Sequence, residues 1–360
     1  MTEAPEMSVV NPVTLSPTTH GQPSTTRPDS AGSPGMRFAV DSWDPAYGTS
    51  TGDLDVDTST AKVSLDVELP QDQWTPIAPT SVVLPESVIF VDGVRRVDAQ
   101  LWLDDRDLSS GDVVGVLPGI CASYAAGAVC CCPESANVVL TLPRRGMFTT
   151  ATQAFPVDTS AGAYPLSTTS PDPSRAPSQV LSQALQRKLA ELELIAAVEA
   201  RSARDASCGP TTDDLLVLDG PLQGRSTLKR TLGYVKTHHS SYLPVDLNAV
   251  VSKLRAGERT PVFRVSSRYD TYTWYLRLPA RAGSPWAGVV RVEATADLTA
   301  LAVIEAANLS QALLPTYASE EYKDTRAPQN LYPIAGLERE LKRRLGDQRL
   351  MYRALRVAAR

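Results

Sequence analysis

Apolar residues in the first half of the chain fall into short runs that predict strands. Lys62–Leu69 alternates apolar and polar residues, as a strand with one exposed face does. Three further strands are predicted close together, at Val88–Leu103, Gly119–Cys132 and Ala136–Leu142. Because short links between neighbouring strands favour an antiparallel arrangement, these three strands predict a meander.

A long helix is predicted from about Ser178 to Arg204, where apolar residues recur every three or four positions. The stripe runs through Leu181, Leu185, Leu189, Leu192 and Ala196. Glu199 follows Ala196 at the same spacing, so we predict that it faces the core side of the helix, with Glu193 on the flank of that face. A glutamate in line with a buried stripe is unusual. A position in a fraying last turn explains Glu199 equally well.

The second half of the chain alternates predicted strands and helices. We predict a strand at Leu215–Leu218, a short helix near Leu228–Val235 and a helix at Asp246–Leu254, then strands at Val262–Ser266, Tyr272–Leu278 and Gly288–Glu293, and helices at Asp297–Leu313, Leu337–Leu345 and Gln348–Ala358. Three close strands, a helix, a strand and a helix follow one another in ribonuclease-H-like proteins. The predicted fold is therefore α/β, with a ribonuclease-H-like mixed sheet flanked by helices and further helices at the C-terminus.

Two stretches are poor in apolar residues and rich in Pro, Ser and Thr. Residues 1–36 predict a disordered N-terminal arm, and residues 149–177 predict a flexible loop or insertion. A chain of 360 residues with 42% hydrophobic residues can bury a sizeable core, as either one large domain or two.

The sequence gives no indication of a membrane segment or of export. No run reaches the ~18–20 apolar residues that span a bilayer, and the N-terminal stretch lacks the basic region and apolar run of a secretory signal. We therefore expect a cytoplasmic protein without membrane contact. Three of the five cysteines are consecutive, Cys130, Cys131 and Cys132, and none forms a CxxC pair, which favours packing within a strand over a zinc site.

Charge is distributed unevenly. The net charge of −5 argues against a protein that coats nucleic acid uniformly, but Glu321–Arg360 holds ten basic and five acidic residues. A basic tail suits a phosphate backbone. A solvated helix face accounts for it equally well.

Two apolar runs end in the same dipeptide, with Asp92 after the first, Asp219 after the second and a glycine after each. One Asp-Gly after a strand is usually a turn. A carboxylate at the end of a buried strand is costly unless it pairs with a cation, so the repeated arrangement suggests two carboxylates that converge on a divalent ion. Carboxylate ligands favour Mg²⁺ or Mn²⁺ over Zn²⁺.

Four short motifs resemble the NurA nuclease family, the DNA-end-processing partners of the HerA ATPase. They are FVDGVRR (Phe90–Arg96), LLVLDGPL (Leu215–Leu222), GYVKT (Gly233–Thr237) and RAPQNLYPIAGLERELKRRLGD (Arg326–Asp347). The resemblance implies one nuclease domain over 37–360 with a ribonuclease-H-like core, a homodimer and Mn²⁺- or Mg²⁺-dependent hydrolysis of DNA. It further implies a 5'-3' exonuclease or endonuclease that works with a HerA-type hexameric ATPase.

The resemblance also implies roles for individual residues. Asp92 and Asp219 would bind the metal, and Tyr332 would be the family's C-terminal tyrosine. The helical glutamate is ambiguous: the stretch ELIAAVEA places it at Glu193, whereas the helical stripe favours Glu199.

The predicted catalytic set is therefore Asp92, Glu199, Asp219 and Tyr332, with Glu193 as the alternative metal ligand. Lys236 and Arg326 are predicted to bind substrate phosphate.

One departure from the family concerns the histidine that follows its C-terminal tyrosine. The sequence here is GLERE, and Glu338 or Asn330 are candidate substitutes for that histidine. The missing histidine keeps a second hypothesis open, a catalytically inactive DNA-binding or assembly subunit of an ATPase complex.

Overall fold

The computed structural model describes residues 57–58, 61–106, 112–133, 135–222, 225, 227–238, 240–267, 269–280 and 286–359. The chain divides into two compact units, Met1–Phe38 and Ala39–Arg360. The predicted arm at 1–36 lies in the first unit and outside the described residues. Within the described ranges, no helix has the length and apolar character needed to cross a membrane.

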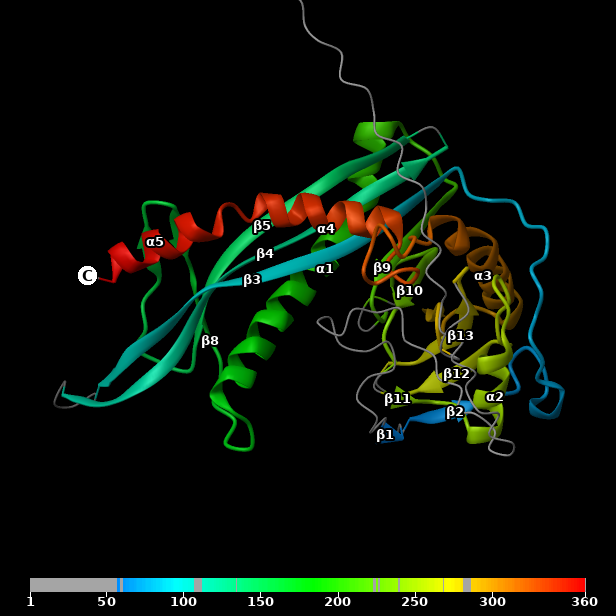
Figure 1. Cartoon of the computed structure of the whole chain (residues 1–360), viewed down its shortest axis with the longest axis horizontal. Helices are drawn as coiled ribbons and strands as arrows, with labels where there is room; N and C mark the ends of the chain where they lie inside the picture. The colour runs from blue at the N-terminus through cyan, green and yellow to red at the C-terminus, as the bar shows by residue number, and fades with distance from the viewer. Residues whose placement is uncertain are drawn as a thin grey trace, which may run out of the picture. The chain divides into compact units, whose positions relative to one another are not determined.

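The second unit is built on a mixed sheet of ten strands (Figure 1). Three of them form the predicted antiparallel meander: β3 (Ser87–Arg106), β4 (Val113–Cys132) and β5 (Ser135–Thr149). Strand β9 (Asp214–Asp219) pairs in parallel with β3, and β10 (Thr231–Val235) pairs in parallel with β9. The order β5-β4-β3-β9-β10, with only β4 running against the others, is the ribonuclease-H-like arrangement, so the fold prediction is confirmed.

Further strands extend this sheet on both sides. Beyond β10 lie β14 (Val289–Thr295), β13 (Thr271–Arg277), β12 (Phe263–Ser266) and β2 (Lys62–Ser64), and β8 (Leu166–Thr168) pairs with β5 at the other edge. Two small sheets pair β6 (Val157–Thr159) with β7 (Gly162–Tyr164) and β1 (Asp57–Thr58) with β11 (Ser240–Ser241). The stretch 149–177, predicted as a loop, therefore contains three short strands, because its backbone groups find partners at the sheet edge and in the β6–β7 pair.

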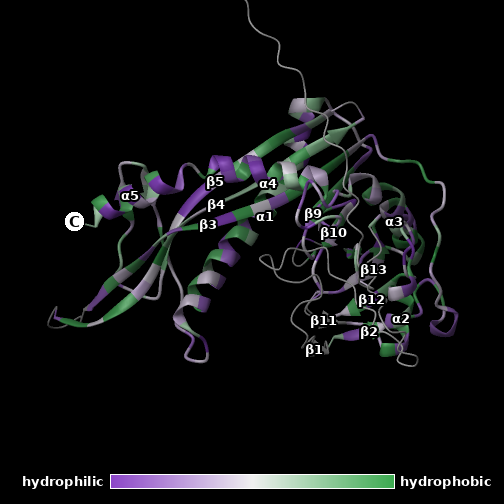
Figure 2. Cartoon of the chain, viewed as in Figure 1, coloured by the Kyte–Doolittle hydropathy of each residue, from purple (hydrophilic) through white to green (hydrophobic). Residues whose placement is uncertain are grey.

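In the described part of the chain, five α-helices accompany the sheet: α1 (Pro177–Cys208), α2 (Val245–Lys253), α3 (Ala300–Leu313), α4 (Tyr332–Arg344) and α5 (Gln348–Ala358). A proline opens α1 and Gly209, with φ of 86°, ends it, as helix termini favour. Figure 2 shows hydrophobic and hydrophilic residues recurring along α1 and α5, as expected of amphipathic helices. The predicted helix near Leu228–Val235 is wrong. Its second half is β10, which lies fully buried between β9 and β14, and a short apolar run does not distinguish a strand from a helix.

Helices α1 and α4 cover opposite faces of β3 and β9. On the α1 face, Ile89, Val91, Leu216 and Leu218 belong to the same core cluster as Leu185, Leu189 and Leu192. On the α4 face, Phe90, Val94 and Val217 cluster with Ile334, Leu337 and Leu341. Since successive strand residues alternate between faces, Asp92 and Asp219 lie on the α4 face and Gly93 lies on the α1 face.

Candidate metal centre

Three carboxylates converge on the α4 face of the sheet. Asp92, Asp219 and Glu338 each offer an oxygen, and the three oxygens lie within 4.8 Å of one another. The parallel register pairs Val91 with Leu218, so the next step along each strand brings Asp92 beside Asp219. Helix α4, packed on the same face, supplies Glu338. The two aspartates predicted to converge therefore do so, and a glutamate from α4 completes the group.

Asp92 carries the clearest sign that this group suits a cation. Its side chain is buried, its Oδ1 accepts the backbone N–H of Gly93 at 2.7 Å, and its Oδ2 has no hydrogen-bond partner among the described residues. Burial, followed by the negative charge of Asp219, raises the pKa of Asp92 well above its usual range, while Lys236 partly opposes the rise. A buried oxygen without a partner is costly. A divalent cation among the three carboxylates would remove that cost, so the residues present fit a metal.

Two basic side chains hold the other two carboxylates. The Lys236 Nζ lies 2.6 Å from Asp219 Oδ2 and donates to Asn330 Oδ1 at 3.1 Å. Arg326 Nη2 donates to both oxygens of Glu338, at 2.8 and 2.7 Å. Burial alone would raise the pKa of Glu338, but the hydrogen bonds and charge of Arg326 lower it. The two residues predicted to bind substrate phosphate thus neutralise the acidic cluster in this structure.

Glu193, the alternative helical ligand, approaches β3 from the α1 face. It lies against Gly93: a Cβ added to that glycine would stand 2.5 Å from Glu193 Oε1. Its Oε2 accepts from Arg225 Nη2 at 2.6 Å. Burial raises the pKa of Glu193, Arg225 opposes the rise, and the charge of Asp219 adds to it. Glu193 is therefore close enough to sense the acidic cluster, although the sheet backbone lies between them.

The prediction that Glu199 faces the core side of its helix is wrong, because its side chain is exposed. The buried stripe continues from Ala196 to Ala200 and Arg204 in steps of four residues. Glu199 precedes Ala200 and therefore lies about 100° away around the helix axis. It does not belong to the carboxylate group found among the described residues.

The pattern that was wrongly assigned to Glu199, a glutamate in line with a buried apolar stripe, is found at Glu338. Buried leucines at 337 and 341 flank it in α4, and it follows the buried Ile334 by four residues. It is therefore a glutamate in line with an apolar stripe, and the sequence alone suggested it only as a substitute for a histidine.

A hollow of about 460 Å³ adjoins Glu338. It is lined by Lys323, Asp324, Thr325, Arg326, Asn330, Tyr332, Ala335, Glu338 and Arg339. Tyr332, the first residue of α4, is 37% exposed, and Lys323 Nζ lies 5.3 Å from the centre of its ring. The predicted catalytic tyrosine is thus at the rim of the hollow, which also contains three basic side chains.

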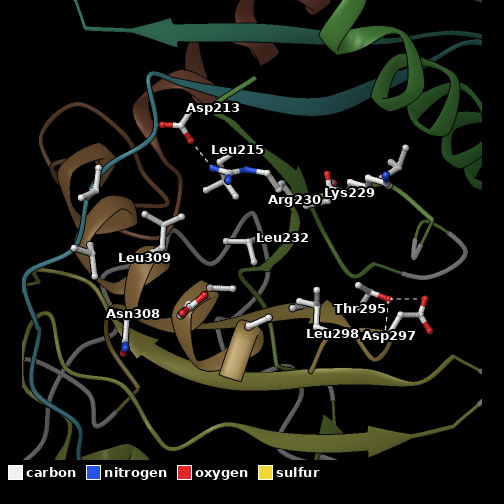
Figure 3. A pocket seen from close by; sticks show the side chains of 18 of the residues that line it. Asp213, Leu215, Lys229, Arg230, Leu232, Thr295, Asp297, Leu298, Asn308 and Leu309 are labelled. Carbon is white, nitrogen blue, oxygen red and sulfur yellow. Dashed lines mark hydrogen bonds and ion pairs between the residues drawn. The ribbon is translucent and has the colours of Figure 1, made fainter. Parts of the chain in front are cut away.

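A larger cavity, of about 900 Å³, opens at the opposite ends of the same strands (Figure 3). Arg230 and Asp213 form an ion pair of 2.6 Å on one side of it, and Leu232 and Leu309 supply apolar lining. Asp213 precedes β9, whereas Asp219 ends it, and a strand rises about 3.3 Å per residue. The cavity therefore lies towards the start of β9, and none of the three carboxylates lines it.

Comparison with known proteins bears on the C-terminal half. A family model described as the NurA domain matches residues 166–343, a range that contains Glu193, Asp219 and Glu338 but not Asp92. None of the curated proteins compared with the chain matches it. The crystal structure of the NurA nuclease from Sulfolobus solfataricus is 10% identical, with 76% of this chain and 84% of that chain covered and a TM-score of 0.37.

A second similar structure is the crystal structure of the catalytic domain of human Endonuclease V. It is 17% identical, with 72% of this chain and 83% of that chain covered and a TM-score of 0.32. Scores this low add nothing to the fold assignment, which comes from the strand order. The family match over residues 166–343 shows that this part of the chain is similar to the NurA domain.

Proposed function

We propose that the chain is a metal-dependent nuclease that hydrolyses phosphodiester bonds in DNA. The observation that carries this proposal is the convergence of Asp92, Asp219 and Glu338 within 4.8 Å, with one buried oxygen of Asp92 lacking a partner among the described residues. Two of these carboxylates lie in the part of the chain that is similar to the NurA domain, and the sequence motifs resemble a family of DNA nucleases.

Asp92, Asp219 and Glu338 would hold the cation, with Glu193 as a further candidate ligand from the α1 face. Oxygen ligands alone suit Mg²⁺ or Mn²⁺. When bound, such a cation supplies an acidified water molecule and stabilises the charge on the reacting phosphate. Lys236 and Arg326 neutralise Asp219 and Glu338 in this structure, and they become available to phosphate oxygens once those carboxylates bind a cation instead.

The hollow beside Glu338 is the proposed entrance for the DNA backbone. Lys323, Arg326 and Arg339 line it, and basic side chains that follow phosphates supply most non-specific affinity for DNA. Tyr332 lies at its rim, where its hydroxyl can donate a hydrogen bond to a phosphate oxygen. Together these residues would guide a strand towards the carboxylates.

Substituting Asp219 by Asn tests the proposal, since the change removes a ligand charge and keeps the side-chain volume. We expect wild-type protein to digest linear DNA in the presence of Mn²⁺, and Asp219→Asn to lose this activity. A ligand at about 100 times its dissociation constant stabilises a protein by ~2.7 kcal/mol. Mn²⁺ should therefore raise the melting temperature of the wild type and leave that of Asp219→Asn unchanged.

Asp297→Asn is a matched control, because Asp297 is an exposed aspartate that lines the distant cavity. It should keep both cleavage and the response to Mn²⁺. Full cleavage by purified Asp219→Asn would show that this aspartate does not hold the metal.

A second candidate function is a catalytically inactive DNA-binding or assembly subunit of a HerA-type ATPase complex. The pairing of Lys236 and Arg326 with two of the carboxylates favours it, because a cation must displace these side chains. It predicts DNA binding without cleavage, with or without the ATPase, and no stabilisation by Mn²⁺. We further propose that the protein acts as a homodimer, which light scattering on the purified chain would test.

A further inference from the structure

Three cysteine thiols meet at the end of β4. Cys130 and Cys132 lie two residues apart on this strand and so share a face of the sheet, with their sulfurs 3.2 Å apart. The intervening Cys131 belongs to the core cluster on the α4 face. Cys208, the last residue of α1, completes the group, and the three sulfurs lie within 4.8 Å of one another. Sequence analysis did not predict this group, because Cys208 is far from the other two cysteines along the chain.

We propose that Cys130, Cys132 and Cys208 form a second metal site, for a thiophilic cation such as Zn²⁺ or Cu⁺. Sulfur ligands at about 2.3 Å from a tetrahedral Zn²⁺ lie ~3.8 Å from one another. One sulfur pair here lies 3.2 Å apart and the others no more than 4.8 Å apart, so small rotations of the side chains suffice. Thiolates select soft cations over Mg²⁺ and Mn²⁺, so this site differs in chemistry from the carboxylate cluster.

Access and geometry both favour a metal over a disulfide between Cys130 and Cys132. Cys208 is exposed and Cys132 is half-buried, so a cation can reach the buried Cys130 from solvent. Strand residues two positions apart have Cα atoms about 6.6–6.8 Å apart. This is the upper limit of the Cα separations that disulfides span. A bond between Cys130 and Cys132 would therefore be strained, whereas a shared cation requires no such approach.

The site would join the end of α1 to β4. Cys208 ends the helix that also carries Glu193, and Cys130 lies on the strand that pairs with β3. A cation held by both elements would oppose fraying of the last turn of α1, since binding to the folded state alone stabilises it by mass action. Zn²⁺ would complete its coordination with a water molecule, whereas Cu⁺ can be held by three sulfurs alone.

Metal titration of the reduced, metal-free full-length chain tests this inference. Co²⁺ serves as the spectroscopic probe for the Zn²⁺ geometry, because thiolate ligands give it intense near-ultraviolet charge-transfer absorption that carboxylates do not. We expect this absorption to saturate at one equivalent and to be displaced by Zn²⁺. Cu⁺, added anaerobically, provides the second arm, and binding of either cation through sulfur supports the site.

Cys208→Ser is the informative variant, since an exposed residue at a helix end can be changed without disturbing the core. It should abolish the absorption and weaken cation binding at least about tenfold. Cys121→Ala, which changes a buried cysteine outside the group, should retain both. Asp219→Asn should also retain them, which separates this site from the proposed nuclease centre.

Two results would overturn the inference. One is the absence of sulfur-to-metal absorption with both cations, and the other is unchanged binding in Cys208→Ser. Mass spectrometry of protein purified without reductant supplies the complementary measurement: a cation bound in proportion to the protein supports the site, and a disulfide within the group with no bound metal contradicts it.

Discussion

Replacement of Gly93 by Ala tests how the two faces of β3 are connected. The added Cβ would lie 2.5 Å from Glu193 Oε1, 2.8 Å from Leu189 Cδ1 and 3.0 Å from Glu193 Cγ. These separations are shorter than van der Waals contact, so one of the two side chains must move. Leu189 is 4% exposed within the α1 core cluster, and Glu193 is tied to Arg225 by an ion pair of 2.6 Å. Neither side chain can therefore move freely.

The expected cost follows from overpacking. An extra methyl group in a well-packed site costs about 1–3 kcal/mol. For a unit that spans Ala39–Arg360, an unfolding entropy of ~2.1 cal/mol/K per residue means that each kcal/mol lowers the melting temperature by roughly 1.5 °C. Gly93→Ala should therefore melt about 1.5–4.5 °C below the wild type. It should also cleave DNA more slowly if Glu193 contributes to the metal centre.

Thermal and urea unfolding of Gly93→Ala, Glu193→Ala and the double variant measure this effect directly. If the methyl group collides with Glu193, truncating Glu193 removes most of the cost, and the double variant departs from additivity by about 0.5–3 kcal/mol. Gly336→Ala is the matched control. A Cβ at this α4 glycine meets no atom within 4 Å, so alanine should stabilise the helix by about 0.5–1 kcal/mol.

The reasoning is refuted if Gly93→Ala unfolds like the wild type. It is also refuted if the two substitutions are additive, because the cost of the methyl group would then have another source.

Three further predictions concern charged residues of the candidate metal centre and the glutamates that were proposed as its ligands. Asp92→Asn should stabilise the metal-free protein at neutral pH. Folding raises the pKa of Asp92, so the stability that its protonated form contributes is fully present below the unfolded-state pKa of ~3.9 and is lost as pH rises through the folded-state pKa. Urea unfolding at pH 4 and pH 8 should show this gain only at the higher pH. Lys236→Met should destabilise the metal-free protein by about 3–5 kcal/mol, since it leaves the largely buried Asp219 without its ion-pair partner. Mn²⁺ should restore part of this lost stability. Equal stability of the variant with and without Mn²⁺ would contradict the prediction. Glu199→Gln should change the free energy of unfolding by no more than about 0.5 kcal/mol and leave DNA cleavage intact, whereas Glu193→Gln should slow cleavage. The reverse ranking of the two variants in a DNA digestion assay would support Glu199 as the metal ligand.

The residues that sequence reasoning placed correctly are those whose position follows from local pattern. An apolar run before an aspartate predicts a buried strand that ends in a carboxylate, and two such strands in parallel register bring Asp92 and Asp219 together. The ribonuclease-H-like fold class also followed from the order of the predicted elements, because short links and strand–helix alternation leave few topologies open, although β10 was predicted as a helix. The match between local pattern and observed structure is closest for α5, whose predicted bounds agree with the structure.

Sequence reasoning misplaced residues where a single sequence is compatible with more than one structure. Spacings of three and four residues fit a helix equally well, so the stripe of α1 was extended to Glu199 rather than to Ala200. The partner of a long-range contact leaves no local signal, which is why Glu338 and Cys208 were not placed. Short apolar runs are ambiguous in the same way, and β10 was predicted as a helix for that reason.

The acidic cluster joins residues that are far apart in the chain, with Asp92 on β3 and Glu338 on α4. A ribosome therefore releases Glu338 long after it has released Asp92. Until α4 docks on the sheet, a nascent polypeptide holds an incomplete set of carboxylates. If the cluster is the nuclease centre, cutting activity is withheld from partly made chains, and fragments that end before α4 should be harmless to the DNA around them.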